Sequence, residues 1–218
     1  MKNVLICIPT IDYKMNCKLV ITLQNIYTIF DKNNIDYLLS FKCGSLINRV
    51  RNEFITQFIE GNFTHLFFID SDLFGFENLI QKFIDSDKDL IGGIYPKKSN
   101  KEGYNCNLKF CIEETLTNDI SQVKHIPTGL MMIKKNVILN LIQSYPERHY
   151  KLNNKDYYNL FDSYVFNGVF LSEDYGFCNL YSIIGGKIYA VLDCIIVHVG
   201  ICEYKGNFKK YLVKKISV

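Results

Sequence analysis

The stretch that decides the fold is Thr64-His65-Leu66-Phe67-Phe68-Ile69-Asp70-Ser71-Asp72. Its first six residues are nearly all apolar, which is typical of a strand buried inside a parallel sheet. Two aspartates follow at once, and ligands of open α/β sheets bind beyond the carboxyl ends of the strands. On extended chain, side chains two residues apart point the same way. Asp70 and Asp72 can therefore face one divalent cation, although a turn in which Asp72 caps the next helix is the alternative.

Around this stretch the chain alternates between strand and helix patterns. Apolar runs predict strands at Asn3–Ile8, Ile35–Phe41 and Asp89–Tyr95. Helices are predicted at Lys14–Asp31, at Glu77–Ile84, and from an N-cap at Ser45 to about Glu60, with Gly61 past its end. This alternation predicts an α/β fold with a doubly wound sheet.

Beyond Pro96 the pattern becomes irregular. We expect a polar loop at Lys97–Glu102 and an irregular strand at Tyr104–Glu113. A buried strand is expected at Gly129–Ile133 and a helix at Lys135–Ser144. The segment Tyr145–Gly168 is predicted to be a long loop, of the kind that often acts as a lid. A helix from Ser172 to Ile184 and two strands on either side of Asp193 complete the chain.

The sequence contains no internal repeat and no low-complexity linker, so we expect one domain over residues 1–218. Within it we distinguish a first half at 1–95, a second half at 96–204 and a basic tail at 205–218.

The composition is that of an ordinary globular protein, with 48% hydrophobic and 22% charged residues. This excludes a disordered chain, a collagen-like chain and a coiled coil. The formal net charge of +3 is too small to favour a nucleic acid as partner. The most apolar stretch, Ile188–Val199, is interrupted by Asp193 and His198, so no transmembrane segment is expected.

The N-terminus lacks the length and the cleavage site of a signal peptide, and no cysteines are spaced as C-x-x-C. We therefore expect a cytoplasmic protein with reduced thiols. The single alanine and the abundance of Asn, Lys and Ile indicate AT-rich coding, as in a low-GC microbe or a large DNA virus. A viral protein would then be located in the cytoplasm of the host.

Three further motifs carry polar groups. Ser172-Glu173-Asp174 opens a helix, so its carboxylates either favour the helix N-terminus or place a general base at a pocket rim. His198 lies in an apolar strand, as core histidines do, but it could complete a metal shell begun by Asp72. Arg51 lies at the border of an apolar helix face, where it either snorkels to solvent or binds a phosphate or carboxylate.

Taken in order, five blocks of the chain resemble a known superfamily. They are Ser45–Gly75, Gly92–Pro96, Pro127–Gly129, Ser172–Asp174 and His198–Gly200. Over about residues 3 to 200 the chain resembles the nucleotide-sugar-dependent glycosyltransferases of the GT-A fold, and is most similar to small virus-encoded and bacterial members with a D-x-D motif. The resemblance implies a three-layer α/β/α sandwich with a mostly parallel central sheet. It also implies that 1–95 is a Rossmann-like, nucleotide-binding half and 96–204 an acceptor and catalytic half.

The resemblance also implies roles for single residues. Asp72 would bind Mn²⁺ or Mg²⁺ directly, with His198 as a later ligand, and Asp70 would contact the metal or the nucleotide ribose. Asp174 would act as the general base, with Glu173 as the rival for that role. The remaining residues expected at the nucleotide and donor sugar are Pro9, Thr10, Asp12, Arg51, Ser71 and Gly129. Gly129 would let the backbone approach the sugar or acceptor closely.

The implied activity is a hexosyltransferase-like transfer, with inversion, from a nucleoside-diphosphate sugar to a hydroxyl of a glycan, protein or small-molecule acceptor. UDP is the expected nucleotide. A nucleotidyltransferase that makes nucleotide sugars is the nearest alternative, but it usually has a Gly-rich loop where this chain reads Ile8-Pro9-Thr10-Ile11-Asp12-Tyr13. A D-x-D phosphatase would use its first strand. A non-catalytic nucleotide- or sugar-binding module is the third alternative, although it has no need of a general base.

Overall fold

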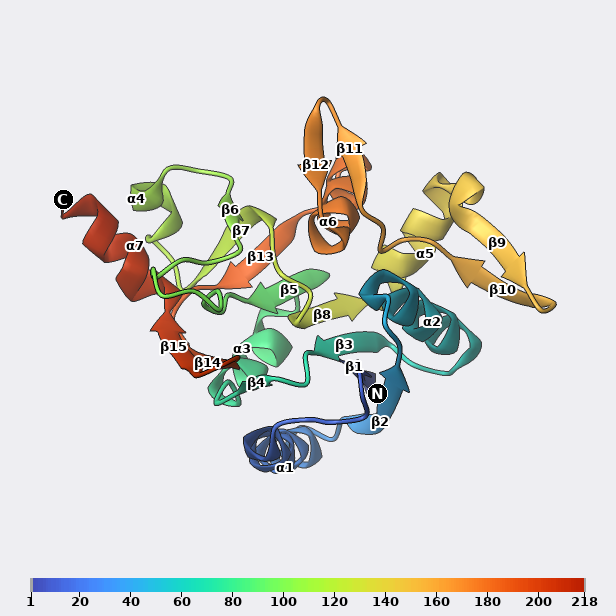
Figure 1. Cartoon of the computed structure of the whole chain (residues 1–218), viewed down its shortest axis with the longest axis horizontal. Coiled ribbons are helices and arrows are strands. Elements are labelled where there is room, and N and C mark those ends of the chain that lie inside the picture. The colour runs from blue at the N-terminus through green and yellow to red at the C-terminus, as the bar shows by residue number, and fades with distance from the viewer. Residues whose placement is uncertain (1, 218) are drawn as a thin grey trace.

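The computed structural model describes residues 2–217, so Met1 and Val218 lie outside the described part. Its centre is one large sheet (Figure 1). The strands of this sheet are β1 (Asn3–Thr10), β2 (Asp36–Cys43), β3 (His65–Ile69), β5 (Leu90–Gly93), β6 (Asn107–Leu108), β7 (Ile120–His125), β8 (Leu130–Lys134) and β13 (Ile188–Val191).

The eight strands follow the order β2-β1-β3-β8-β5-β13-β7-β6. β1 pairs in parallel with β2 and β3, and β13 pairs in parallel with β5. Strand β8 runs antiparallel between β3 and β5, and β7 runs antiparallel between β13 and β6. Six of the eight strands therefore run in one direction, which confirms the α/β class with a mostly parallel central sheet.

Helices cover both faces of the sheet. They are α1 (Cys17–Lys32), α2 (Ile47–Glu60), α3 (Asn78–Ser86), α5 (Lys135–Ser144) and α6 (Glu173–Ile183). Because side chains of a strand alternate between faces, Leu5 and Cys7 of β1 pack with α2, α5 and α6, whereas Val4, Ile6 and Ile8 pack with α1 and α3. The result is a three-layer α/β/α sandwich. Within residues 2–217, none of the helices combines the length and apolar character needed to cross a membrane.

A second, three-stranded sheet connects the end of the chain to the end of β3. It consists of β4 (Leu73–Phe74), β14 (Ile195–Val199) and β15 (Glu203–Asn207), and α7 (Phe208–Ile216) follows it. In its register His198 is opposite Leu73, and Val199 N donates to the carbonyl of Asp72 at 2.8 Å. This pairing brings His198 beside the D-x-D motif. The described part of the basic tail forms the end of β15 and α7.

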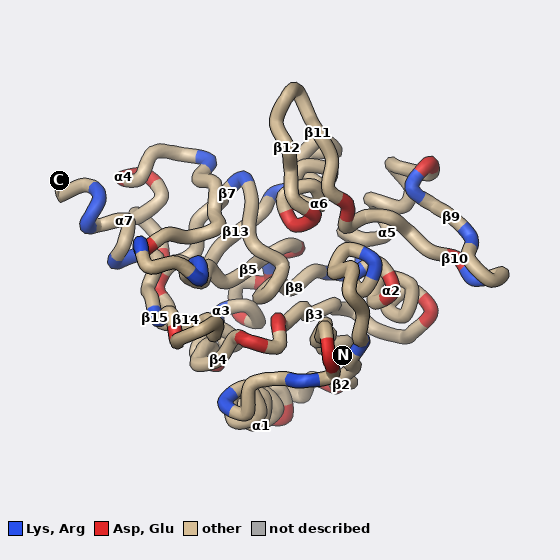
Figure 2. The backbone as a smooth tube through the Cα atoms, viewed as in Figure 1, with Lys and Arg blue, Asp and Glu red and all other residues tan. Residues whose placement is uncertain are grey.

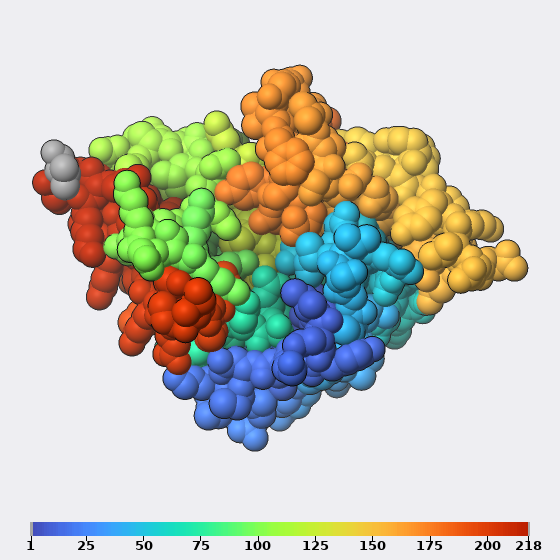
Figure 3. All heavy atoms as spheres, viewed as in Figure 1, coloured from blue at the N-terminus to red at the C-terminus, as the bar shows by residue number. Residues whose placement is uncertain are grey.

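The prediction of a long loop at Tyr145–Gly168 was wrong. After a short 3₁₀ helix at Pro146–Arg148, the chain forms a hairpin of β9 (His149–Leu152) and β10 (Lys155–Tyr158). A second hairpin, of β11 (Tyr164–Phe166) and β12 (Val169–Leu171), projects from the body of the protein (Figures 1 and 3). Both hairpins turn at residues with positive φ, which Asn and Gly adopt most readily: Asn153, Asn154, Asn167 and Gly168.

Three smaller predictions also need correction. The N-cap of α2 is Leu46 rather than Ser45, and it makes no side-chain capping bond. Of the irregular strand expected at Tyr104–Glu113, only β6 is extended, and a short helix, α4 (Ile112–Thr115), follows it. Strand β7 was not predicted, although Ser121 and Val123 are buried between more exposed neighbours, the alternation typical of a strand.

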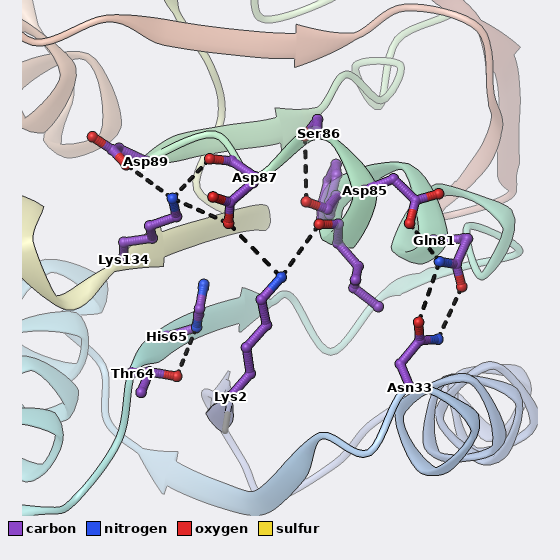
Figure 4. Close-up of polar contacts among 12 residues, drawn as sticks. Lys2, Asn33, Thr64, His65, Gln81, Asp85, Ser86, Asp87, Asp89 and Lys134 are labelled. Atoms are coloured by element: carbon purple, nitrogen blue, oxygen red, sulfur yellow. Dashed lines mark hydrogen bonds and ion pairs between the residues drawn. The ribbon is translucent and has the colours of Figure 1, made fainter.

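His65 lies at the start of β3, at the opposite end of that strand from Asp70, and is 9% exposed. Its Nδ1 lies 2.8 Å from Thr64 Oγ1, and Figure 4 shows Lys2, Lys134 and Asp87 around it. Burial, reinforced by the charges of Lys2 and Lys134, lowers the pKa of His65 from 6.5 to about 4. The folded protein therefore keeps this imidazole neutral.

We expect the free energy of unfolding to fall as the pH drops from 6.5 to 4, by up to about 3 kcal/mol. The unfolded chain takes up a proton at His65 in this range and the folded protein does not, so the stabilisation is complete only above the unfolded pKa. Urea unfolding at several pH values measures this dependence. His65→Gln should flatten the curve. Equal slopes for wild type and His65→Gln would contradict the assignment.

Candidate active site

A cleft of about 300 Å³ opens at the carboxyl ends of β1, β2 and β3. This is where parallel strands end and where open α/β sheets bind ligands. Asp12 lies outside the lining, because its carboxylate pairs with Lys14 at 2.8 Å on an exposed loop. The cleft is lined by Pro9, Thr10, Ile11, Gly44, Ser45, Ile47, Arg51, Asp70, Ser71 and Asp72.

Arg51 joins two carboxylates that are far apart in the sequence. Its side chain is 4% exposed, with Nη2 3.2 Å from Asp70 Oδ1 and Nη1 2.8 Å from Glu173 Oε1. Burial raises the pKa of both carboxyls above their ordinary values, against the opposing charge of Arg51. The anionic partner that the sequence required for a buried Arg51 is therefore supplied by the chain itself.

Gly129 allows the backbone to pack against Asp70. Asp70 N donates to the Gly129 carbonyl at 2.8 Å, and Gly129 N donates to the hydroxyl of Tyr95 at 3.2 Å. A Cβ at this position would overlap both the Asp70 carboxylate and the Tyr95 hydroxyl. The side chains packed against Gly129 are thus those of Asp70 and Tyr95, and the expected approach of its backbone to a sugar or acceptor stays a prediction.

Asp72 and His198 face each other across the β4–β14 pairing. His198 Nε2 lies 3.5 Å from Asp72 Oδ1, and Nδ1 lies 2.8 Å from the carbonyl of Pro96. A carbonyl only accepts hydrogen bonds, so Nδ1 carries a proton, and in the neutral ring Nε2 keeps its lone pair. Burial works to raise the pKa of Asp72, but His198, when its ring is protonated, and Lys98 outweigh it and lower that pKa.

These two side chains fit a hard divalent cation. Asp72 Oδ1 is buried and accepts no hydrogen bond from the described residues 2–217, and the His198 tautomer leaves Nε2 able to bind a metal. Across residues 2–217 no group of three or more His, Cys, Asp or Glu side chains is arranged to hold a metal ion. The chain would thus supply two ligands, as in Mg²⁺ and Mn²⁺ sites completed by phosphates. Asp70, by contrast, pairs with Arg51.

Three buried side-chain polar atoms lack a hydrogen-bond partner within residues 2–217, and all three belong to this region. They are Arg51 Nε, Asp72 Oδ1 and Thr128 Oγ1. Arg51 and Asp72 line the cleft, and Thr128 precedes Gly129. Buried polar atoms are nearly always hydrogen-bonded, so their concentration here indicates a place built to receive a polar ligand.

The adjacent carboxylates at the start of α6 have different surroundings. Glu173 pairs with the guanidinium of Arg51. Asp174 instead has neutral partners, because its Oδ1 accepts from the Ser172 hydroxyl and from Tyr175 N, the latter at 2.8 Å. Ser172 is the N-cap of α6, as predicted, but its hydroxyl binds Asp174 and makes no capping bond to a backbone N–H.

Three residues of this site were given no role by the sequence analysis. Tyr95 and Thr128 lie in blocks that carried the resemblance, so their position was available although their partners were not. Lys98, whose ammonium pairs with Asp72 Oδ2, lies in a segment predicted only as a polar loop. No motif distinguishes it from the neighbouring lysines.

Comparison with known proteins identifies relatives in fold only. The sequence matches no protein-family model and no curated protein. Among solved structures, A197 from STIV is 18% identical with a TM-score of 0.53, over 92% of this chain and 86% of that one. That likeness shows a shared fold.

Two other solved structures are more distant. A glycosyltransferase involved in the glycosylation of the major capsid of PBCV-1 is 11% identical with a TM-score of 0.35, over 65% of each chain. The 4-diphosphocytidyl-2C-methyl-D-erythritol synthase of Anaerococcus prevotii is 11% identical with a TM-score of 0.44, over 98% of this chain and 96% of that one.

Proposed function

We propose that this protein is a glycosyltransferase that uses Mn²⁺ or Mg²⁺ to transfer a sugar from a nucleoside-diphosphate sugar to an acceptor hydroxyl. The observation that carries the proposal is the pairing of a buried, unbonded Asp72 Oδ1 with His198 Nε2 at the edge of a cleft beyond β1, β2 and β3. Pro9, Thr10 and Ser71 line that cleft and would contact the nucleotide, for which UDP is our expectation.

Asp72 and His198 would hold the metal ion, which would supply positive charge against the departing nucleoside diphosphate. Arg51 orients Asp70 by an ion pair, and Asp70 would accept hydrogen bonds from the ribose hydroxyls. The unbonded Nε of Arg51 leaves one donor of the guanidinium for a ligand. Arg51 and His198 lie within α2 and β14, and Asp70 and Asp72 lie between β3 and β4, so regular elements hold the site.

Asp174 would act as the general base. Its carboxylate would take the proton of the acceptor hydroxyl while that oxygen forms a bond to the anomeric carbon. The bond from this carbon to the diphosphate oxygen breaks with its electron pair on the leaving group, and attack from the opposite side inverts the centre. We assign the role to Asp174 because Glu173 is already the partner of Arg51.

Thermal unfolding with UDP, GDP, CMP and TDP, each with and without Mn²⁺, tests the proposal. One nucleotide should raise Tm in the presence of Mn²⁺ by roughly 5–10 °C at 100 times its Kd, since such binding adds about 2.7 kcal/mol. Asp72→Asn keeps the size of the side chain but removes its charge, and it should abolish the Mn²⁺-dependent part of the shift.

The outcomes separate the classes of protein. No shift with any nucleotide in the presence of Mn²⁺ would contradict the proposal. Release of pyrophosphate from a nucleoside triphosphate and a sugar phosphate would identify a nucleotidyltransferase instead. Nucleotide binding without turnover on glycan, protein and small-molecule acceptors would identify a binding module.

A further inference from the structure

Lys98 lies on a closed, basic loop beside the metal-binding pair. The loop spans residues 97–103 and carries Lys97, Lys98 and Lys101. It is closed at its base, where Pro96 bridges Tyr104 and Lys97 N donates to the Gly103 carbonyl at 2.8 Å. Figure 2 shows basic positions of this region close to β14 and β15. Of these three lysines, Lys98 is the one whose ammonium contacts the site that we expect to receive phosphates.

Two contacts place Lys98 at Asp72. Its ammonium pairs with Asp72 Oδ2, the oxygen that does not face His198. Its aliphatic stem lies against Gly200, where a Cβ would come within 3.1 Å of Lys98 Cδ. Figure 3 shows the green segment near residue 100 packed against the red segment near residue 200. Gly200, in the His198–Gly200 block, thus provides the surface on which Lys98 rests.

The ion pair itself is weakly held. The side chains of Lys98 and Asp72 are 39% and 35% exposed, and ion pairs with this exposure contribute little to stability. A divalent cation bound to Asp72 would repel an ammonium a few ångströms away. Lys98 would then have to leave Asp72, and its flexible stem can carry the ammonium to a nearby anion.

We propose that Lys98 is a diphosphate ligand that exchanges partners: it neutralises Asp72 in the free protein and moves to the nucleotide diphosphate when a divalent cation binds Asp72. The inference rests on the proposed function, because it requires a nucleoside diphosphate in the cleft. It adds a cationic side chain to the donor site beside Arg51 and the metal ion. It also means that the metal ion and the Lys98 ammonium compete for the carboxylate of Asp72.

Calorimetric titration of the full chain with UDP, uridine and Mn²⁺ tests this exchange. Lys98→Met keeps the stem but removes the charge, so UDP affinity with Mn²⁺ should fall about tenfold while uridine affinity stays unchanged. Without nucleotide, Mn²⁺ should bind Lys98→Met several-fold more tightly than wild type. Lys101→Met removes the same charge from the same loop and should leave both affinities close to wild type.

The outcomes distinguish this inference from the proposed function. If wild type binds UDP with Mn²⁺ and Lys98→Met binds it equally well, the exchange is wrong and the proposed function stands. If Lys101→Met loses as much affinity for UDP as Lys98→Met, the total positive charge of the loop is responsible. That result would contradict a specific contact between Lys98 and the diphosphate. If wild type binds neither UDP nor another nucleoside diphosphate, both proposals fail together.

Discussion

Replacing Arg51 with methionine should lower the free energy of unfolding by about 3–5 kcal/mol, because removing one partner of a buried ion pair leaves charges without compensation. Arg51 bridges Asp70 and Glu173, and no other basic side chain forms an ion pair with either carboxylate within residues 2–217. Methionine fills much of the same volume. The decrease in the free energy of unfolding therefore reflects the lost charge more than a change in packing.

The pH dependence of this loss gives a second test. Burial already raises the pKa of Asp70 and of Glu173, and loss of Arg51 would raise both further. A carboxyl whose pKa is higher in the folded than in the unfolded state costs stability once the pH is above its unfolded pKa. Arg51→Met should therefore be most destabilised at neutral pH and approach wild type as the pH falls and both carboxyls become protonated.

Arg49 provides the matched control on the same helix. Its side chain is 60% exposed and pairs with Glu53 one turn away at 3.2 Å, so Arg49→Met should cost only about 0.5 kcal/mol or less. Urea unfolding of the three proteins between pH 4 and pH 8 measures both effects. Equal losses for the two variants would show that the bridge by Arg51 contributes no more than a surface pair.

Asp174→Asn should lower sugar transfer by about 10²–10⁴-fold, the usual contribution of a general base. Asparagine keeps an oxygen that can accept from Ser172 and Tyr175 N, so the start of α6 should be undisturbed. Binding of the nucleotide donor should stay at the wild-type value, because the lost group takes a proton only during transfer. Single-turnover kinetics with saturating donor measures the chemical step directly.

Glu173→Gln is the control for Asp174→Asn. It weakens the pair with Arg51, so its effect should appear as a lower Tm, with a smaller loss of transfer. Wild-type transfer by Asp174→Asn together with a large loss in Glu173→Gln would move the base to Glu173. Wild-type transfer by both variants would remove a carboxylate base from the proposed mechanism.

The parts of the fold that the sequence predicted are those encoded by local patterns. The apolar runs of β1 and β3 and the amphipathic helix α2 could be predicted from the sequence. Their buried positions are apolar and follow one another in the pattern typical of a buried strand or of one helix face. The hairpins between α5 and α6 were missed because their strands are short and mostly exposed, so burial leaves no clear period in them. Asn167-Gly168 is nevertheless a hairpin turn signal, and it would have located one of them.

The candidate site was predictable in composition but not in its pairings. Asp72, Arg51 and His198 were each recognised as groups that need a partner or a ligand. Which groups they meet depends on long-range pairing, since His198 reaches Asp72 through β14 and Glu173 reaches Arg51 across 122 residues. Lys98 could not be found in this way, because it reaches Asp72 from a polar loop 26 residues further along the chain and no motif marks it.

The antiparallel strand β8 has a consequence for how this chain reaches its folded state. β5 pairs only with β8 and β13, both of which come later in the sequence, and β3 meets β8 about 65 residues downstream. During synthesis, β2, β1 and β3 can associate early, but β5 has to wait with both edges unpaired. Exposed strand edges and distant pairings slow folding and invite aggregation. Cutting the chain at residue 95 would therefore leave a fragment in which β5 lacks both of its partner strands.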